Sequence, residues 1–339
     1  MSDSETHAAL VRRLLERTIA EGSIVLPAVP SLLVEYTTIC DQLFRTLGVV
    51  FSAAERERLE AVLAEQLAIA FDASPRSQIV ITYQAPVGST LTYHVKPQWV
   101  TLEDAYDSWV AEREPPLFGT QPDARVWSLA HATADPASFP ILDLGAGTGR
   151  NALALARRGH PVDAVEFSPM FVEQLRRGAT NELLNMRILQ RDFLVDRVEL
   201  RDDYALIVLS EVVTDFRSTD QLHQVFSLAA QCLAPSGRLV MSVFLPKEGA
   251  SIEIAARELG QQCYSSIFTW AEIDAARAGL PLVLENVETV AAYEPEHLPD
   301  GAWPPTAWYE RWIHGQDVFS TDPSSSPIAL HWLVFRHVP

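Results

Sequence analysis

Apolar positions in the first seventy residues recur at the three- and four-residue spacing of amphipathic helices. One stripe runs from Leu10 to Ile19 and ends near Gly22, and a second lies between residues 32 and 47. A third follows Ser52-Ala-Ala-Glu55, in which the serine and the glutamate have the spacing of a capping box. The pattern predicts three helices, whose simplest role is packing or the pairing of two copies as a homodimer.

The pattern changes to a period of two between residues 79 and 95. Apolar and polar residues alternate from Ile79 to Tyr83 and again from Leu91 to Val95, on either side of the turn-forming sequence Pro86-Val-Gly-Ser89. Such alternation around a turn predicts a β-hairpin. The three helices and the hairpin together form an expected N-terminal cap region, residues 1–100.

From residue 141 onwards, short apolar strands alternate with helical segments. The alternating part has predicted strands at residues 141–144, 162–167, 187–190, 204–209 and 239–245. Strands that are apolar throughout are typical of a parallel sheet covered by helices on both faces. Two further strands, 282–292 and 328–336, follow. We therefore predict an α/β fold, with a doubly wound, Rossmann-like sheet of seven strands in residues 101–339 and an aromatic-rich insertion at residues 294–327.

The balance of charge argues against a polyanionic partner. The chain of 339 residues has 44 acidic and 26 basic residues, for a formal net charge of −18, and its basic residues form no stripe. Nucleic acid is therefore not an expected partner. The three cysteines are widely spaced, which favours free thiols over disulfides or a metal site. Because no apolar run reaches transmembrane length, we expect a cytoplasmic protein without a membrane partner.

The first strand of the alternating part ends in three closely spaced glycines, Gly145, Gly147 and Gly149. Glycines between a strand and a helix let the backbone approach a ligand closely. The fingerprint of dinucleotide sites is G-x-G-x-x-G, whereas this turn is G-x-G-x-G, with the third glycine one residue early. The turn therefore predicts a ligand site whose spacing is not that of a dinucleotide site.

The stretch Leu142-Asp-Leu-Gly-Ala-Gly-Thr-Gly149, followed by an acidic strand end at Glu166, resembles the first motif of the class I S-adenosylmethionine-dependent methyltransferases. The ending Gly149-Arg-Asn151 is similar in particular to the tellurite-resistance-type and thiopurine-type small-molecule methyltransferases. The resemblance implies a Rossmann-like methyltransferase fold, S-adenosyl-L-methionine as cofactor and a small-molecule acceptor. Those families do not generally share the first hundred residues, so the identity of the acceptor does not follow from it.

The same resemblance implies which residues bind the cofactor. Asp143 would lie on its methionyl side, Glu166 would accept hydrogen bonds from the ribose hydroxyls, and Asp192 would accept one from the adenine amine. The transferred methyl group would lie near the end of the fourth strand. The implied cofactor-binding residues are Tyr106, Trp109, Asp143, Gly145, Ala146, Gly147, Asn151, Glu166, Phe167, Ser168, Met170, Asp192, Phe193, Ser210, Glu211 and Val212.

Methyl transfer from a sulfonium is an in-line displacement with an activated leaving group, so the protein mainly has to align the reactants and exclude water. The resemblance also implies an aromatic lid over the cofactor, for which Tyr106 and Trp109 are the expected residues. If the acceptor is a hydroxyl or an ammonium group, Glu211, Asp215 or Tyr106 could take its proton. His314 is a weaker candidate, since a lone histidine in a loop is more often solvated. Glu211 could equally be a strand-end acid that contacts only the cofactor.

Three functions remain open from the sequence. A small-molecule methyltransferase is favoured by the cofactor motif and the acidic composition. A protein or peptide methyltransferase would recognise its partner through the N-terminal region, and a non-catalytic scaffold would bind the cofactor without turning it over. The tryptophan-rich segment 303–312 also has two interpretations, because it either forms a wall of the acceptor site or closes the core over the sheet edge.

Overall fold

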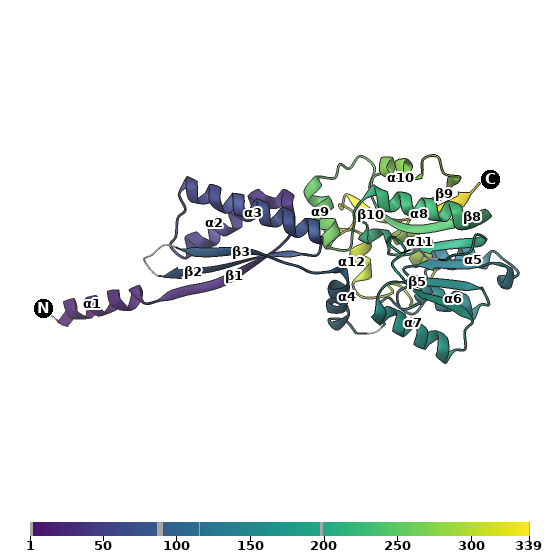
Figure 1. Cartoon of the computed structure of the whole chain (residues 1–339), viewed down its shortest axis with the longest axis horizontal. Coiled ribbons are helices and arrows are strands. Elements are labelled where there is room, and N and C mark those ends of the chain that lie inside the picture. Colours follow the sequence, from purple (N-terminus) through teal and green to yellow (C-terminus); the bar gives the residue numbers. More distant parts are fainter. Residues whose placement is uncertain (1–2, 87–90, 115, 197–198, 339) are drawn as a thin grey trace. The chain divides into compact units, whose positions relative to one another are not determined.

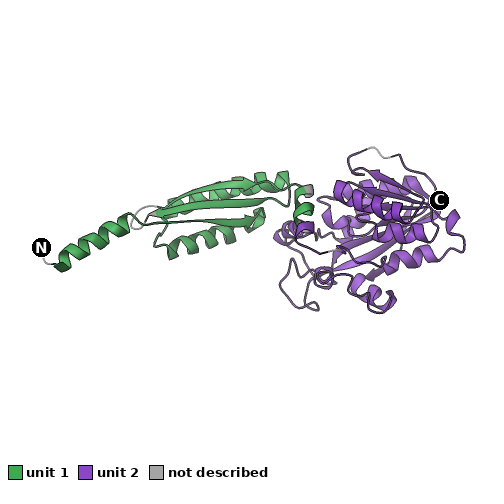
Figure 2. Cartoon of the chain, turned by 90° about the horizontal axis from the view of Figure 1, so that it is seen from below, with its two compact units in different colours: residues 1–108 green, residues 109–339 purple. Residues whose placement is uncertain are grey.

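The computed structural model describes residues 3–86, 91–114, 116–196 and 199–338. The chain divides into two compact units, residues 1–108 and residues 109–339 (Figure 2). The division falls inside the helix α4, Leu102–Ala111, and each unit contains its own sheet. The domain boundary expected at residue 100 stays a prediction, because compactness does not test whether either part folds alone.

Unit 1 is a three-stranded antiparallel sheet with helices packed on one face (Figure 1). Before α4 its helices and strands, besides a short 3-10 helix, are α1 Asp3–Glu16, β1 Ile19–Pro27, α2 Leu33–Thr46, α3 Ala53–Ala73, β2 Gln78–Pro86 and β3 Thr92–Gln98. The strand order is β1-β2-β3, so β2 is central. Its side chains Ile79 and Ile81 are fully buried, as is Leu63 of α3. The core of unit 1 therefore lies between the sheet and its helices.

The sequence predicted much of this unit. The hairpin is confirmed by the antiparallel pairing of β2 with β3, while its turn, residues 87–90, lies outside the described residues. The capping box is confirmed as well, since the Ser52 side chain accepts a hydrogen bond from the Glu55 backbone N–H. The second and third predicted helices correspond to α2 and α3.

The first predicted helix is wrong at its C-terminal end. α1 ends at Glu16, and residues 19–27 form β1, which pairs along its whole length with β2. Gly22 does not end a helix, because it lies opposite Tyr83, where a Cβ atom would come within 2.5 Å of the tyrosine hydroxyl oxygen. A short apolar run is compatible with both the helical and the strand period. Here the pairing with a strand far along the chain decides for the strand.

Unit 2 contains a doubly wound sheet of seven strands, which confirms the predicted fold class. Besides short 3-10 helices, its helices and strands after α4 are α5 Ala124–His131, β4 Ile141–Leu144, α6 Arg150–Arg157, β5 Val162–Glu166, α7 Pro169–Asn181, β6 Met186–Gln190, β7 Tyr204–Leu209, α8 Thr219–Cys232, β8 Leu233–Pro246, α9 Ile254–Gln262, α10 Trp270–Arg277, β9 Leu282–Thr289, α11 Val290–His297, α12 Tyr309–Ile313 and β10 Ile328–His337. The strand order is β6-β5-β4-β7-β8-β10-β9, and β10 is antiparallel to both of its neighbours. The winding direction reverses between β4 and β7, and their carboxyl ends are where such sheets bind ligands.

Helices cover both faces of this sheet (Figure 1). α8 and α10 pack on one face, against a cluster that contains Leu144, Ile207 and Phe226. α5, α6, α11 and α12 pack on the other face, where Trp332 of β10 is fully buried. Neighbouring residues of one strand, such as Ile207 and Val208, belong to opposite clusters. Burial on both faces explains why the inner strands are apolar throughout.

Two predicted strand boundaries in this unit are wrong. The strand expected at residues 282–292 ends at Thr289, whose side chain accepts a hydrogen bond from the Ala292 N–H and so starts α11. β8 begins at Leu233, directly after α8, rather than at residue 239. The first difference matters for the site, because α11 carries Glu294 into the interior of unit 2.

Candidate active site

The loop after β4 has a conformation that glycine adopts easily and other residues do not. Gly145, Gly147 and Gly149 have φ angles of +72°, +55° and +95°, all in the left-handed region. A Cβ atom on Gly145 would come within 2.4 Å of the Val212 side chain, so the segment after β7 lies directly against the turn. α6 starts at the next residue, Arg150. The glycines thus allow a strand end, a tight turn and a helix start to share one small space.

Glu166 ends β5 and holds this turn from the neighbouring strand. Its carboxylate accepts hydrogen bonds from the Gly147 N–H and the Ser168 N–H, each at 2.8 Å. Burial raises the pKa of Glu166, and the two amide bonds oppose that shift. A carboxylate oxygen has more than one lone pair, so each oxygen retains acceptor capacity. The ribose-binding role of Glu166 stays a prediction, and the position of its carboxylate is compatible with it.

Asp143 is a buried acid with an unsatisfied oxygen. It lies in β4, its side chain is almost fully buried, and its Oδ2 has no hydrogen-bond donor within the described part of the chain. Burial, followed by the charge of Asp123, raises the pKa of Asp143 to about 7. A buried acceptor without a donor is rare in folded proteins. Next to a glycine turn, it fits the positively charged or donor group of a ligand.

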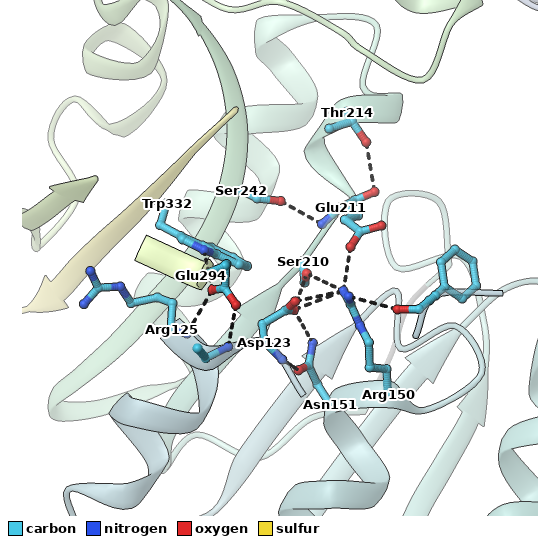
Figure 3. A network of polar contacts seen from close by, with 12 residues as sticks. Asp123, Arg125, Arg150, Asn151, Ser210, Glu211, Thr214, Ser242, Glu294 and Trp332 are labelled. Atoms are coloured by element: carbon cyan, nitrogen blue, oxygen red, sulfur yellow. Dashed lines mark hydrogen bonds and ion pairs between the residues drawn. The ribbon is translucent and has the colours of Figure 1, made fainter. Parts of the chain in front are cut away.

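Arg150 lies at the centre of a network that the sequence did not predict (Figure 3). Its guanidinium donates to the Phe118 carbonyl at 3.1 Å, to Asp123 at 3.1 Å and to Glu211 at 2.5 Å. The Arg150 side chain is only 7% exposed. Burial alone would lower its pKa, but the charges of Asp123 and Glu211 raise it. One cation thus joins the segment before α5, the start of α6 and the end of β7.

Asp123 is bound from two further sides. Asn151 forms a reciprocal pair with it, because the Asn151 side chain accepts from the Asp123 N–H at 2.9 Å and donates to the Asp123 carboxylate at 2.8 Å. The Ser210 hydroxyl donates to the same carboxylate at 2.6 Å. Asn151 and Ser210 were both predicted to bind the cofactor. The structure shows that they hold Asp123, and their contact with a cofactor stays a prediction.

Glu211 has an unusual backbone for a residue with a side chain. Its φ angle is +61°, in the left-handed region that costs a non-glycine residue of the order of 1–3 kcal/mol. Its N–H donates to the Ser242 hydroxyl at 2.8 Å, and its carbonyl accepts from the Thr214 hydroxyl at 2.9 Å. Burial raises the pKa of Glu211, while the neighbouring Arg150 lowers it. The carboxylate that was predicted to act in catalysis is therefore held by an ion pair.

Glu294 is a second buried acid that the sequence did not single out. Its carboxylate accepts from the backbone N–H groups of Ala124 and Arg125 at 2.7 and 3.1 Å, and from the Trp332 indole at 2.9 Å (Figure 3). It therefore caps the first turn of α5, where backbone N–H groups have no partner inside the helix. Burial, followed by the charge of Asp123, raises the pKa of Glu294 to about 7. No local pattern marked this residue, because its partners lie far away in the sequence.

Four more predicted cofactor-binding residues follow the carboxyl ends of β5 and β6. Asp192 accepts a hydrogen bond from the Leu194 N–H at 2.9 Å, which closes the turn after β6. Phe193 is half-buried and packs against the cluster on the α8 face. Phe167 and Met170 are half-buried at the start of α7. These residues therefore share one edge of the sheet with the glycine turn.

Three more predicted residues shape the backbone at this edge. Ala146 donates its N–H to the Val165 carbonyl at 3.1 Å. Ser168 is the N-cap of α7 and accepts from the Phe171 N–H at 3.4 Å. Val212 lies against Gly145. Their positions agree with a cofactor site, and their contacts with a cofactor stay predictions.

The structure does not test the predicted lid. Tyr106 lies in α4 within unit 1, whereas the glycine turn belongs to unit 2. The side chain of Trp109 lies outside the part of the structure that is described. A lid formed by these two residues, and a role for Tyr106 in proton transfer, therefore stay predictions.

The other candidate proton acceptors differ in position. Asp215 ends a short 3-10 helix, Val213–Asp215, that follows β7. It lies close enough to Glu166 for its charge to add to the effect of burial in raising the pKa of that acid. His314 follows α12, and its Nδ1 pairs with the Glu310 carbonyl at 2.7 Å. The electrostatic effect of Asp215 thus places it near Glu166, one of the predicted cofactor residues.

The aromatic segment contributes to the core of unit 2. Trp312 and Tyr309 are buried in the cluster on the α6 face, and the Trp312 ring packs edge-on against Phe244 with 5.3 Å between the centroids. Trp303 contacts Tyr309 at a centroid distance of 5.7 Å. These buried rings therefore support the second interpretation of the segment, in which it closes the core.

A small cavity lies beside the charged network. Its volume is about 100 Å³, and its lining residues are Thr120, Gln121, Pro122, Asp123, Arg150, Glu294, Leu298, Gly301, Ala302, Pro304 and Pro305. Asp123 and Arg150 connect this cavity to the end of β7 through Ser210 and Glu211. Residues 120–122 and the loop between α11 and α12 form the rest of the wall.

Comparison with known proteins identifies one segment of unit 2. Residues 141–237 match the family model of a methyltransferase domain. The uncharacterized methyltransferase YodH of Bacillus subtilis (strain 168) is 30% identical over 127 residues, which are 37% of this chain and 52% of that protein. The chain therefore spans about half the length of this relative. The predicted methyltransferase domain is confirmed for this segment, and a nearest relation to the tellurite-resistance-type or thiopurine-type enzymes is not shown.

Two solved structures resemble the chain in outline. A geranyl diphosphate C-methyltransferase from Streptomyces coelicolor A3(2) is 16% identical with a TM-score of 0.48, and the match covers 63% of this chain and 77% of that one. A putative sarcosine dimethylglycine methyltransferase from Galdieria sulphuraria is 14% identical with a TM-score of 0.49, over 70% of this chain and 98% of that one. The strand order and the glycine turn of the present structure carry the fold assignment.

Proposed function

We propose that this chain is an S-adenosylmethionine-dependent methyltransferase that acts on a small molecule. The hydrogen bond between Glu166 and the Gly147 N–H carries this proposal. A pyrophosphate site offers free N–H groups to a negative ligand, whereas this turn presents a carboxylate. The unsatisfied Oδ2 of Asp143 adds a second carboxyl oxygen that can accept a hydrogen bond. S-Adenosylmethionine has no phosphate and carries an ammonium and a sulfonium, so its charges complement this site.

In this proposal, three acids along the sheet edge bind successive parts of the cofactor. Asp143 accepts a hydrogen bond from the ammonium end, Glu166 accepts from the ribose hydroxyls with its remaining lone pairs, and Asp192 receives the adenine amine. Burial makes the bonds to Asp143 and Glu166 stronger than the same bonds in water. When bound, the cofactor supplies a methyl group on positively charged sulfur, which is an activated leaving group. The chain itself then binds, orients and excludes water.

Arg150 and its partners hold together the segments that lie beside the end of β7, where we place the methyl acceptor. The bond from Arg150 to the Phe118 carbonyl fixes the segment before α5 to the end of β7. The ion pair holds the charge of Glu211, so this residue orients groups at the strand end. If the methyl acceptor must lose a proton, we propose that Asp215 takes that proton, with Tyr106 as the alternative. A positioned carboxylate can take a proton during transfer.

Three observations favour a small acceptor. The cavity beside Arg150 has a volume of about 100 Å³. The Gly149-Arg-Asn151 ending is similar to that of tellurite-resistance-type and thiopurine-type enzymes, which act on small molecules. The formal net charge of −18 disfavours a nucleic acid. A protein acceptor recognised by unit 1 is the alternative that the experiment below distinguishes.

We also propose a cytoplasmic location. Cys40, Cys232 and Cys263 form no disulfide within the described residues, and reduced cysteines persist in reducing compartments. No described helix combines the length and the apolar character needed to cross a membrane.

Titration calorimetry with S-adenosylmethionine tests the cofactor directly. The proposal expects saturable binding of one molecule per chain, and the absence of binding would contradict every version of it. Incubation with cofactor labelled in the methyl group and a cell extract then tests the acceptor. The label is expected in the fraction of low molecular mass. Label that enters only the macromolecular fraction would favour the protein acceptor, and binding without any transfer would favour the scaffold.

A further inference from the structure

Unit 2 contains a second cavity, lined by α5, by the C-terminal end of α6 and by the chain after α11. Its volume is about 560 Å³, and small-molecule sites in proteins have volumes of about 300–1,000 Å³. Arg157 and Arg158 line it at the end of α6, about 10 Å along the helix from Arg150. The cavity is therefore large enough for a small molecule and is centred away from the glycine turn.

The lining of this cavity differs in charge from the rest of the chain. The chain has 44 acidic and 26 basic residues, yet among the described residues that line the cavity none is acidic and two are arginines. Arg157 is already neutralised, because the Glu182 carboxylate accepts hydrogen bonds from two nitrogens of its guanidinium. Arg158 forms no ion pair with any residue that the structure describes. One positive charge thus remains at the cavity without an acid beside it.

The guanidinium of Arg158 is held only by weak contacts. It lies 5.5 Å from the centre of the Trp127 ring, and its Nη2 is 3.5 Å from the carbonyl oxygens of His131 and Thr133. Hydrogen bonds from N–H groups to oxygen are usually about 2.7–3.2 Å long, so both of these are long. A guanidinium has donors on three nitrogens, and these two bonds use one of them. Arg158 can therefore bind an anion without losing a strong hydrogen bond.

Apolar side chains surround this cation. Ala124 and Ala154 are buried, and Trp127 and Leu298 are half-buried, so each of them presents carbon atoms to the cavity. Such a lining, with one charged group, complements a ligand that has an apolar body and one negative charge. A carboxylate carries one charge and matches the planar guanidinium of Arg158 with two parallel hydrogen bonds. A phosphate monoester carries nearly two charges, and the second would have no cation here.

We propose that this cavity binds a small apolar carboxylate, with its carboxylate on the Arg158 guanidinium and its body against Trp127 and Leu298. Residues 120–122 line this cavity as well as the smaller one beside Arg150, and they lead directly into Asp123. A bound ligand would thus lie next to the segment that Arg150 holds. The inference concerns a separate site and does not depend on the proposed methyltransferase activity.

Titration calorimetry of the full chain with three probes that share a benzyl group tests the site. Phenylacetate is expected to bind saturably, with one molecule per chain, and phenethylamine and benzyl phosphate are expected to bind at least about tenfold and a few-fold more weakly, respectively. The absence of saturable phenylacetate binding, or equal or tighter binding of either other probe, would overturn the proposal. Phenylacetate is also expected to bind in the presence of saturating S-adenosylmethionine. Binding that the cofactor abolishes would place the probe in the cofactor site and overturn the proposal as well.

Two substitutions test the position of the carboxylate. Arg158→Gln removes the unpaired cation and is expected to weaken phenylacetate binding at least about tenfold. Gln121→Glu keeps the shape of an exposed lining residue, adds a negative charge and is expected to weaken binding several-fold. Arg177→Gln, which removes an exposed arginine of α7 outside the cavity, is the control and should bind like the wild type.

Circular dichroism checks that each variant remains folded. Unchanged affinity in a folded Arg158→Gln variant would overturn the proposal. If Arg158→Gln does not fold, Gln121→Glu decides alone, and its binding phenylacetate as tightly as the wild type would then overturn the proposal. A loss of affinity in Arg177→Gln equal to that in Arg158→Gln would show a general effect of net charge and would also contradict a site at Arg158.

Discussion

The two units expose and bury opposite kinds of side chain. Unit 1 leaves the apolar stripe of α1 in contact with water, whereas unit 2 encloses Asp123, Arg150, Glu211 and Glu294 at the edge of its sheet. Both arrangements are unfavourable when considered alone, because exposed apolar stripes promote association and buried charges lose their hydration. The exposed stripe agrees with the homodimer that the sequence analysis expects, and the buried charges agree with the charged ligand that we propose for unit 2.

The buried network of unit 2 should respond most strongly to mutation. Arg150→Met is expected to lower the free energy of unfolding by about 3–5 kcal/mol, because it leaves Asp123 and Glu211 buried without a cation. Urea denaturation followed by fluorescence measures the change. Arg177→Met removes an arginine from an exposed pair with Glu173 and is expected to cost less than about 1 kcal/mol. Equal losses in the two variants would remove the contrast between buried and exposed charge.

The glycine turn should respond next. Glu166→Gln keeps the shape of the side chain but removes its charge, and charge-assisted hydrogen bonds contribute about 1.5–3 kcal/mol. Affinity for S-adenosylmethionine is therefore expected to fall about 10- to 100-fold in calorimetry. Glu173→Gln, on the exposed side of α7, is the control and should bind like the wild type. Unchanged affinity of Glu166→Gln would show that this acid does not hold the cofactor.

The pH dependence of the free energy of unfolding should reveal the raised pKa of the buried acids in unit 2. In the folded chain the pKa of Asp143 is raised from 3.8 to about 7, so the folded state keeps a proton that the unfolded state has already lost. The free energy of unfolding is therefore expected to fall as the pH rises from about 4 to about 7. Asp143→Asn should make this fall shallower, and Asp300→Asn, at an exposed position, should leave it unchanged. Identical pH profiles of the wild type and Asp143→Asn would contradict the raised pKa.

The smallest effect concerns the surface of unit 1. Leu14→Ala and Val34→Ala each remove part of a side chain that is about two-thirds exposed, and surface changes of this kind are usually within about 0.5 kcal/mol. If α1 pairs with a second copy, Leu14→Ala lowers the melting temperature at high protein concentration and leaves it unchanged at high dilution. Val34→Ala should have no concentration-dependent effect. Thermal scans of both variants over a dilution series provide the measurement, and parallel behaviour would count against pairing.

Much of the site edge could be predicted because its signals are local. The sequence places Asp143, Glu166 and Ser210 at or directly after strand ends, and parallel strands bring their carboxyl ends to one edge. Asp123 and Glu294 could not be found in the same way. One precedes α5 and the other lies in α11, where the sequence pattern predicted the end of a strand and an aromatic insertion. Their roles depend on hydrogen-bond partners that lie far away in the sequence, and a local sequence pattern does not predict such partners.

The sequence by itself determined the glycine turn and the succession of strands and helices along most of unit 2. Both depend on properties of neighbouring residues, since positive φ angles require glycine and an apolar run marks a buried strand. Only the tertiary structure decided that residues 19–27 pair as a strand and that Glu294 caps α5 across 170 positions of sequence. Hydrogen-bond partners and burial are properties of the packed chain. They decide that Arg150 lies among buried acids and that the pKa of Asp143 is raised.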